Sequence, residues 1–395
     1  MAEQSVAPQA RRSILAFAAG GLLGLALGGC QLVPAPREEP PPAEPAGPQA
    51  PEPRPQPNLP PDQARNRVAV LVPLSGANAT VGRSIANAAN LALLDTGGER
   101  IRISVYDTAS VGPAAAANQA LAEGNGLFLG PLLAEDVRAV SPIARRAGVP
   151  VVAFSNDVSV AGNGTYLMGF TPGQSVARVV FYARSKGVQR FAALVGDGVY
   201  GRRAGQALAD SIGDARLAGI QELARDIPAI RSAVGRLNAQ GDYEAVLIAD
   251  SGRNAALAVP VLRAGRPSVQ ILGTELWAAE PALGRNPALR GAWYAAVSDS
   301  MFNQLRTRYR ARYGTDPHRL ASLGYDAALL AVRVAKDWRA GRPFPERALR
   351  DPGGFSGVDG AFRFGADGIA ERSLEVREVT VGGTTILSPA ARNFD

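Results

Sequence analysis

The stretch GLFLGPLLAEDVRAVSPIARRAGVPVVAFSND, residues 126–157, contains the unit that decides the fold of this chain. Its two ends, 126–130 and 149–154, are short apolar runs typical of buried strands. Between them, residues 135–147 follow a helical pattern. A strand, a helix and a second strand in this order predict two parallel strands joined by a crossover helix.

The same alternation of strands and helices continues on both sides of this unit. Parallel sheets covered by helices on both faces are expected from such an order, and about 330 residues are too many for one sheet. We therefore predict an α/β protein with two Rossmann-like lobes. Strands are expected at 68–74, 101–106, 191–195, 216–223, 245–249, 269–273, 292–297 and within 358–387. Helices are expected at 82–94, 113–122, 174–185, 202–212, 227–239, 253–264, 300–313 and 321–338.

Polar residues follow several of the predicted strands. In open parallel sheets, ligands bind beyond the carboxyl ends of the strands, so these residues are the candidates for a ligand cleft. They are Ser75, Asp107, Ser155, Asn156, Asp157, Tyr200, Asp250 and Glu275.

ALVGDGVYGRR, residues 193–203, contains G-x-G-x-x-G between a predicted strand and a predicted helix. This is the pattern of a dinucleotide-binding turn. However, Asp197 would repel a pyrophosphate, and Tyr200 would crowd it. We interpret the stretch as a strand-to-helix turn in which Gly198 and Gly201 give backbone freedom and close helix packing, with Tyr200 directed towards the cleft.

The N-terminus has the three parts of an export signal. Arg11 and Arg12 precede the apolar run Ile14–Leu27, and small residues follow it. This run is shorter than the roughly 20 residues of a membrane span. Leu27-Gly28-Gly29-Cys30 resembles the lipobox of bacterial lipoproteins, which implies cleavage before Cys30 and lipidation of its thiol. Both the general secretory route and the twin-arginine route stay open.

The resemblance to lipoproteins also implies a location. In enterobacterial lipoproteins an Asp after the lipid site favours the inner membrane, so Gln31 implies a periplasmic protein anchored to the outer membrane. Residues 31–66 contain 13 prolines in 36 residues and few large apolar side chains. We predict a disordered, semi-rigid linker that reaches up to roughly 100 Å and tethers the globular part to the membrane.

The composition excludes several function classes. The chain of 395 residues carries a formal net charge of +7 without a long run of like charges, which argues against a nucleic-acid partner. It has one cysteine, Cys30, and one histidine, His318, which we expect to cap a helix or lie on the surface. Zinc, P-loop, Ser-His-Asp and S-x-x-K motifs are missing from the sequence. We predict no enzyme, no metal site and no cofactor.

Several segments together resemble the type I periplasmic binding proteins of the leucine-binding family. The resemblance covers about residues 68–387. It rests on VAVLVPLSGANATVGRSIANAANLAL, VYDTAS, the stretch at 127–157, ALVGDGVYGRR, ILGTELW and SLGYDAALLAVRVA. It implies two lobes with a hinge and an interlobe cleft: the first from about 67–172 and 299–357, the second from about 173–298 and 358–389, within a domain that spans 67–395.

Two kinds of protein with this fold fit the resemblance. Amino-acid receptors of ABC transporters usually grip the ligand carboxylate with hydroxyls after the G-P turn, where this chain has Leu133-Ala134-Glu135. Penicillin-binding protein activators are lipoproteins that stimulate a bifunctional peptidoglycan synthase, and 127–157 and AGNGTYLMGFTP are more similar to them. The well-studied activators carry an additional N-terminal helical-repeat domain, where this chain has only the linker. We therefore expect a synthase as partner, with an ABC permease and an amino acid or related small polar ligand as the alternative.

Overall fold

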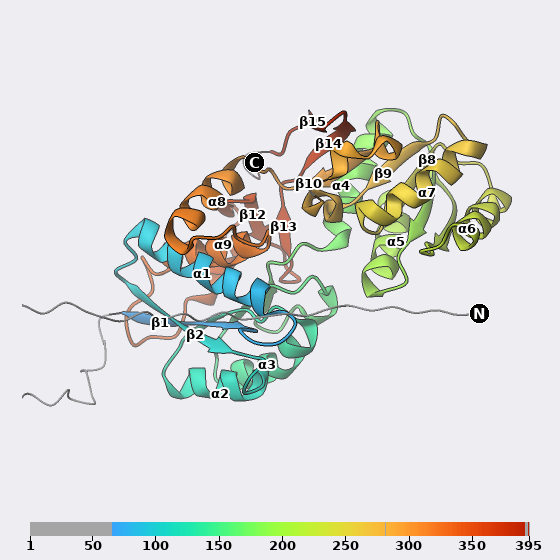
Figure 1. Cartoon of the computed structure of the whole chain (residues 1–395). Helices are drawn as coiled ribbons and strands as arrows, with labels where there is room; N and C mark the ends of the chain where they lie inside the picture. The colour runs from blue at the N-terminus through green and yellow to red at the C-terminus, as the bar shows by residue number, and fades with distance from the viewer. Residues whose placement is uncertain (1–64, 281, 392–393, 395) are drawn as a thin grey trace, which may run out of the picture. The chain divides into compact units, whose positions relative to one another are not determined.

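The computed structural model describes residues 65–280, 282–391 and 394. The predicted signal peptide, Cys30 and nearly all of the predicted linker lie outside these residues. All described helices and strands belong to one compact unit, which consists of the predicted two α/β lobes (Figure 1). In the part of the chain that the structure describes, no helix is both long and apolar enough to cross a membrane.

The first lobe is built on a five-stranded parallel sheet with the strand order β2-β1-β3-β4-β5. Its strands are β1 (Asn66–Val72), β2 (Ile101–Asp107), β3 (Leu127–Leu129), β4 (Val151–Ala153) and β5 (Thr165–Leu167). β1 and β3 lie in the middle and are entirely apolar from Val68 onward, as expected for strands that helices cover on both faces.

Helices cover both faces of this sheet. One core cluster joins the sheet to α1 (Ala79–Thr96), α8 (Ser300–Tyr313) and α9 (Ala321–Val334). A second cluster joins it to α2 (Pro113–Ala122) and α3 (Ala134–Arg146) on the opposite face, as Figure 1 shows. On one face α1 packs against α9, and on the other α2 packs against α3. This is the doubly covered sheet that the alternation predicted.

The second lobe has a seven-stranded sheet of order β15-β14-β10-β9-β8-β6-β7. The strands β6 (Arg190–Val195), β7 (Arg216–Glu222), β8 (Ala245–Ala249), β9 (Gln270–Gly273) and β10 (Trp293–Ala296) are parallel, and β14 (Glu375–Thr380) and β15 (Gly383–Ser388) are antiparallel. α4 (Pro172–Ser185) and α5 (Val199–Ser211) share one core cluster with the sheet, and α6 (Ile227–Gln240) and α7 (Gly252–Gly265) share the other.

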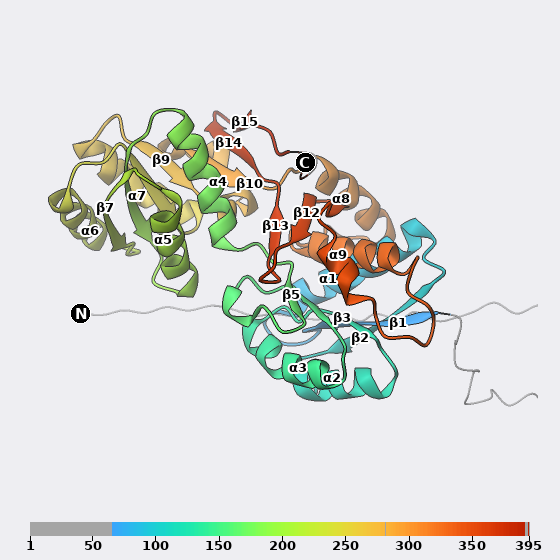
Figure 2. The same ribbon diagram turned by 180° about the vertical axis from the view of Figure 1, so that it is seen from behind.

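A small antiparallel sheet corrects the predicted lobe boundary. It consists of β11 (Phe355–Gly357), β12 (Gly360–Phe364) and β13 (Ala370–Arg372). β11 contacts α9, and Figure 2 shows β12 next to α9. We assigned residues 358–389 to the second lobe, but Val358, Phe362 and Ala370 are buried in the α1–α9 cluster of the first. Their apolar side chains complete that core, so the chain passes to the second lobe only at β14.

Short 3₁₀ helices complete the structure: η1 (Val158–Val160), η2 (Glu275–Ala279), η3 (Leu283–Arg285), η4 (Pro287–Leu289) and η5 (Glu346–Arg350). The chain crosses between the lobes three times, after β5, after β10 and after β13. We call the residues around these crossings, 168–171, 297–299 and 373–374, the crossing segments.

Candidate functional site

A cavity of about 410 Å³ lies between the two lobes, and we call it the interlobe cavity. Its wall is formed by loops that follow strands, by η2 and by the start of α9. Most of its side chains are apolar. The lining residues are Asn78, Val81, Leu132, Leu133, Phe154, Asn156, Phe170, Glu275, Leu276, Ala278, Ala279, Val297, His318, Arg319, Leu320 and Leu323. The cavity therefore lies at the carboxyl ends of the strands, but it is less polar than the sequence predicted.

Glu275 is the carboxylate of this wall. It begins η2 directly after β9 and Thr274. The Tyr200 hydroxyl donates a hydrogen bond of 2.8 Å to its Oε1, and the Ser175 hydroxyl of α4 donates to its Oε2. Burial raises the pKa of Glu275 to about 7, although both hydrogen bonds lower it. Each carboxyl oxygen of Glu275 therefore accepts one hydrogen bond from a hydroxyl of its own lobe.

The glycines of the 193–203 stretch explain how Tyr200 reaches Glu275. A Cβ on Gly201 would lie 1.9 Å from the Gly196 carbonyl oxygen, so only glycine lets α5 approach the end of β6 this closely. Gly198 is different: its backbone is extended, with φ −93° and ψ −177°, and a Cβ there would meet open space. The predicted packing role is thus confirmed for Gly201, whereas no conformational need explains Gly198.

The three candidates that follow β4, Ser155, Asn156 and Asp157, have different roles in the structure. Asn156 lines the interlobe cavity. Ser155 is buried, and its hydroxyl accepts a hydrogen bond of 3.1 Å from the Asp157 amide. Asp157 caps η1 and pairs with Arg138 at 2.7 Å. Burial raises the pKa of Asp157, but the bonds from Ser159 and Arg138 outweigh it and hold the pKa below its usual range. Ser155 and Asp157 therefore stabilise the loop to which they belong.

Three further candidates do not line the cavity. Asp107 accepts hydrogen bonds from the Leu74 amide at 2.8 Å and the Ser75 hydroxyl at 3.0 Å. Burial raises its pKa, but these bonds and those from Ala109 and Ser110 dominate and bring the pKa to about 2. Asp250 accepts from the Ser251 amide and the Asn254 side chain at the start of α7. These carboxylates satisfy the unpaired amides of strand-end turns, a structural role.

Sequence reasoning missed the loop before α9, which supplies His318, Arg319 and Leu320 to the cavity. His318 Nδ1 accepts from the Leu320 amide in the turn before α9, although α9 has no side-chain cap. Burial followed by the charge of Arg319 lowers the pKa of His318. Arg319 donates to Asp359 at 2.7 Å and to Ser322 at 3.0 Å. The segment follows no strand, so the strand-end rule could not identify it.

Arginines connect the crossing segments to one another. Arg377 of β14 pairs with Asp299, bonds Glu375 and donates to the Val297 carbonyl at 3.1 Å. Arg372 is 8% exposed, donates to the Met168 carbonyl at 2.8 Å and stacks on Phe170. Arg319 approaches the same Asp299 to 3.9 Å. Ion pairs at Asp299 and Glu375, together with the contacts of Arg372 with Met168 and Phe170, therefore hold the chain around all three crossings.

Comparisons with known proteins agree with this architecture. Residues 66–384 match the family model described as "Periplasmic binding protein". No curated protein matches the sequence. A putative branched-chain amino acid ABC transporter protein from Rhodospirillum rubrum has a TM-score of 0.71 at 20% identity, and the match covers 82% of this chain and 100% of that one.

Two other solved structures have similar scores. LpoA from Haemophilus influenzae has a TM-score of 0.65 at 20% identity, with 82% of this chain and 59% of that chain covered. A solute-binding protein of an ABC transporter from R. palustris, in complex with 4-hydroxybenzoate, has a TM-score of 0.64 at 17% identity, covering 84% of this chain and 97% of that one. At these identities the likeness establishes the fold and leaves the ligand open.

Proposed function

The chain belongs to the periplasmic binding protein family, and we propose that within this family it is a regulator of cell-wall synthesis. In this proposal the protein is a lipoprotein, anchored through Cys30 to the outer membrane. Its two-lobed domain docks on a bifunctional peptidoglycan synthase and activates it without catalysing a reaction. Docking that favours the active conformation of the synthase shifts its population towards that state.

The observation that carries the proposal is the state of the polar groups around the interlobe cavity. An α-amino acid needs donors for its carboxylate and acceptors for its ammonium. Leu133 stands where receptors have a hydroxyl, and the Ser155 hydroxyl accepts from a backbone amide. Arg319 donates to Asp359 and Ser322, and Glu275 accepts from two hydroxyls. Ser155, Arg319 and Glu275 thus each have a bonding partner within the protein, and Leu133 offers no donor, which favours a function other than amino-acid capture.

The likeness to LpoA, a protein of the activator class, is compatible with this proposal, as are the predicted lipid anchor and linker. The chain spans only 59% of that protein, so the synthase partner is not carried over from it.

A second candidate function is favoured by the cavity itself. About 410 Å³ of space with leucine, phenylalanine and valine walls would accept a small apolar or aromatic ligand. The protein would then be the substrate-binding lipoprotein of an ABC transporter. The R. palustris protein is described as the solute-binding protein of such a transporter. The apolar walls shift the expected ligand away from the small polar solutes that the sequence suggested.

Synthase assays test the first proposal. Glycan polymerisation and peptide cross-linking by each bifunctional synthase of the source organism are measured with and without the lipidated chain. We expect a rise in either activity with one synthase, and an unchanged rise with Glu275→Gln, because the cavity is not the docking surface. The absence of both binding and stimulation would reject the proposal.

A ligand screen tests the second candidate. Amino acids and hydroxybenzoates are added at millimolar concentration and the melting temperature is followed; a ligand at 100 times its Kd stabilises by about 2.7 kcal/mol. Leu133→Arg should abolish a genuine shift by filling the cavity. A cross-linked pull-down from membranes separates the two functions directly, since it recovers either a synthase or a permease.

A further inference from the structure

A basic surface lies at the end of the first lobe opposite the interlobe cavity. We define the basic end as Arg65, Arg67, Arg100, Arg102, Lys336, Arg339 and Arg342. These residues stand at the amino ends of β1 and β2 and in the segment after α9. The cavity begins beyond the carboxyl end of β1, about 20 Å away for a strand of seven residues. The two surfaces can therefore act separately.

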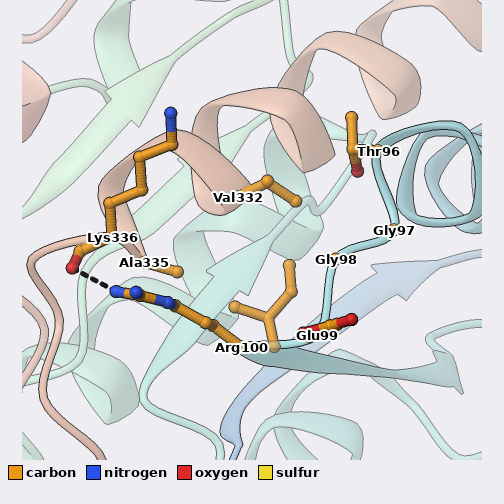
Figure 3. Close-up of a pocket in the computed structure, with 9 residues that line it drawn as sticks. Thr96, Gly97, Gly98, Glu99, Arg100, Val332, Ala335 and Lys336 are labelled. Carbon is orange, nitrogen blue, oxygen red and sulfur yellow. Dashed lines mark hydrogen bonds between the residues drawn. The ribbon is translucent and has the colours of Figure 1, made fainter.

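Two hollows shape the basic end. The first, about 190 Å³, is lined by Arg100, Lys336 and Glu99 among others, and Figure 3 shows the Arg100 guanidinium against the Lys336 carbonyl. The second, about 580 Å³, is lined by Arg65, Arg67 and Arg342. The described lining residues thus include five bases and one carboxylate, a composition that favours an anionic partner.

In the described part of the chain, no ion pair with a carboxylate is formed by Arg67, Arg100, Arg102, Lys336, Arg339 or Arg342. Arg67 donates to the Glu123 carbonyl and Arg100 to the Lys336 carbonyl, and both acceptors are backbone oxygens. In the described part of the chain, Arg102, Lys336, Arg339 and Arg342 have no side-chain hydrogen bond or ion pair. The acidic residues nearby are Asp95, Glu99, Glu123 and Asp337. Asp95 pairs with Arg308 of α8, and Glu123 accepts from Tyr106 and Gln119. Seven bases against four acids leave a net charge of +3.

Two observations indicate what covers this surface. Arg65, the first described residue, belongs to the basic end, so the preceding chain joins the domain there. Cys30 precedes Arg65 by 35 positions. Leu94, 58% exposed, stands on the last turn of α1, which ends at the first hollow. A basic surface with an exposed apolar side chain, next to the attachment of an anchor, has the chemistry of a membrane-facing surface.

We propose that the basic end binds the anionic phospholipid headgroups of the membrane that holds the protein. Arg100, Arg102, Lys336, Arg339 and Arg342 face the phosphates, and Leu94 contacts the headgroup layer. One lipidated residue and a basic surface are two signals that strengthen each other. The domain then alternates between a membrane-bound position and an extended position on its linker. This proposal rests on the lipid anchor of the proposed function, and its test involves neither a synthase nor a cavity ligand.

Vesicle binding of residues 65–395 tests the proposal. This part contains every described element and both lobes' cores, so it is expected to fold without the preceding residues. We expect sedimentation with vesicles of phosphatidylglycerol and phosphatidylethanolamine, little with phosphatidylcholine, and a steep loss with added salt. The variant Arg102→Gln/Lys336→Gln/Arg339→Gln/Arg342→Gln should bind at least about tenfold more weakly.

A matched control removes the same charge from the other lobe. Arg203, Arg216, Arg231 and Arg253 are exposed residues on the surface of the second lobe, and their replacement by Gln should leave vesicle binding unchanged. Circular dichroism and melting temperature verify that both variants fold. Leu94→Gln should weaken binding further.

Three results would overturn the proposal. The first is equal loss of binding in the two fourfold variants, because net charge and not the basic end would then be responsible. The second is displacement by inorganic phosphate at the concentration of accessible lipid, which would indicate a site for a single anion. The third is a concentration-dependent dimer that only the basic-end variant loses, which would assign the surface to a second copy of the chain.

Discussion

The Tyr200 hydroxyl donates a hydrogen bond of 2.8 Å to Oε1 of Glu275, which joins the turn after β6 to the turn after β9. This hydrogen bond favours the carboxylate form of Glu275, and Tyr200→Phe removes it. We therefore expect the pKa of Glu275 to rise further above about 7. Carboxyl ¹³C chemical shifts titrated between pH 4 and 9 measure it. Tyr243→Phe, which breaks a hydrogen bond to Asn238 elsewhere in the lobe, should leave that pKa unchanged.

Stability should decrease as the pH rises towards neutrality. Glu275 has an ordinary pKa of 4.5 when exposed and about 7 in the folded protein, so the native state retains a proton that the unfolded chain releases between these values. Its stabilising contribution is complete below pH 4.5 and lost above pH 7. Asp326 is also buried, and burial together with the charge of Asp359 raises its pKa to about 7. Its titration therefore also lowers stability as the pH rises.

We expect the free energy of unfolding in urea to fall by about 1–3 kcal/mol from pH 5 to pH 8. Glu275→Gln cannot ionise, so it should reduce this dependence and leave the part due to Asp326. A pH dependence identical to that of the wild type would show that Glu275 titrates normally in the native state.

Two helical glycines should respond oppositely to alanine. Gly201→Ala places a methyl group 1.9 Å from the Gly196 carbonyl oxygen and should destabilise by about 2 kcal/mol or more. Gly235 is exposed within α6, and a methyl group added there would have no neighbour within 4 Å, so Gly235→Ala should stabilise by about 0.5–1 kcal/mol. Urea midpoints of the two variants decide the matter, and a neutral Gly201→Ala would contradict the packing role.

Arg377 should contribute strongly to the stability of the crossing segments. Arg377→Gln leaves Glu375, 3% exposed, without its counter-charge, and breaking such a buried pair costs about 3–5 kcal/mol. Arg310→Gln, which breaks the exposed pair with Asp316, should leave the unfolding midpoint nearly unchanged. If both variants unfold at the same urea concentration, the contacts at Asp299 and Glu375 do not stabilise the crossing segments.

The sequence predicted the fold well because strands and helices alternate with clear periodicity. The helix at 113–122 has the predicted bounds, and the two lobes follow from counting such units. Residues 358–372 were placed in the wrong lobe, because short strands with glycine turns carry no information about which core receives them.

The site was harder to predict, for a physical reason. Carboxylates after strands can bind a ligand or satisfy the free amides of their own turn, and the two uses look alike in sequence. Asp107, Asp157 and Asp250 serve their turns, whereas Asn156 and Glu275 reach the cavity. Arg319 and Phe170 line it from segments that only the tertiary fold brings together.

Because the chain crosses between the lobes three times, the second lobe can fold fully only when the last strands are present. Because β10 lies next to β14, the parallel part of the second-lobe sheet has an uncovered edge until residues 375–388 are present. A chain that ends prematurely after β13 would have a finished first lobe and an unfinished second one, although most of the second lobe precedes the cut. We therefore expect a C-terminal truncation to expose an aggregation-prone edge far from the cut in sequence.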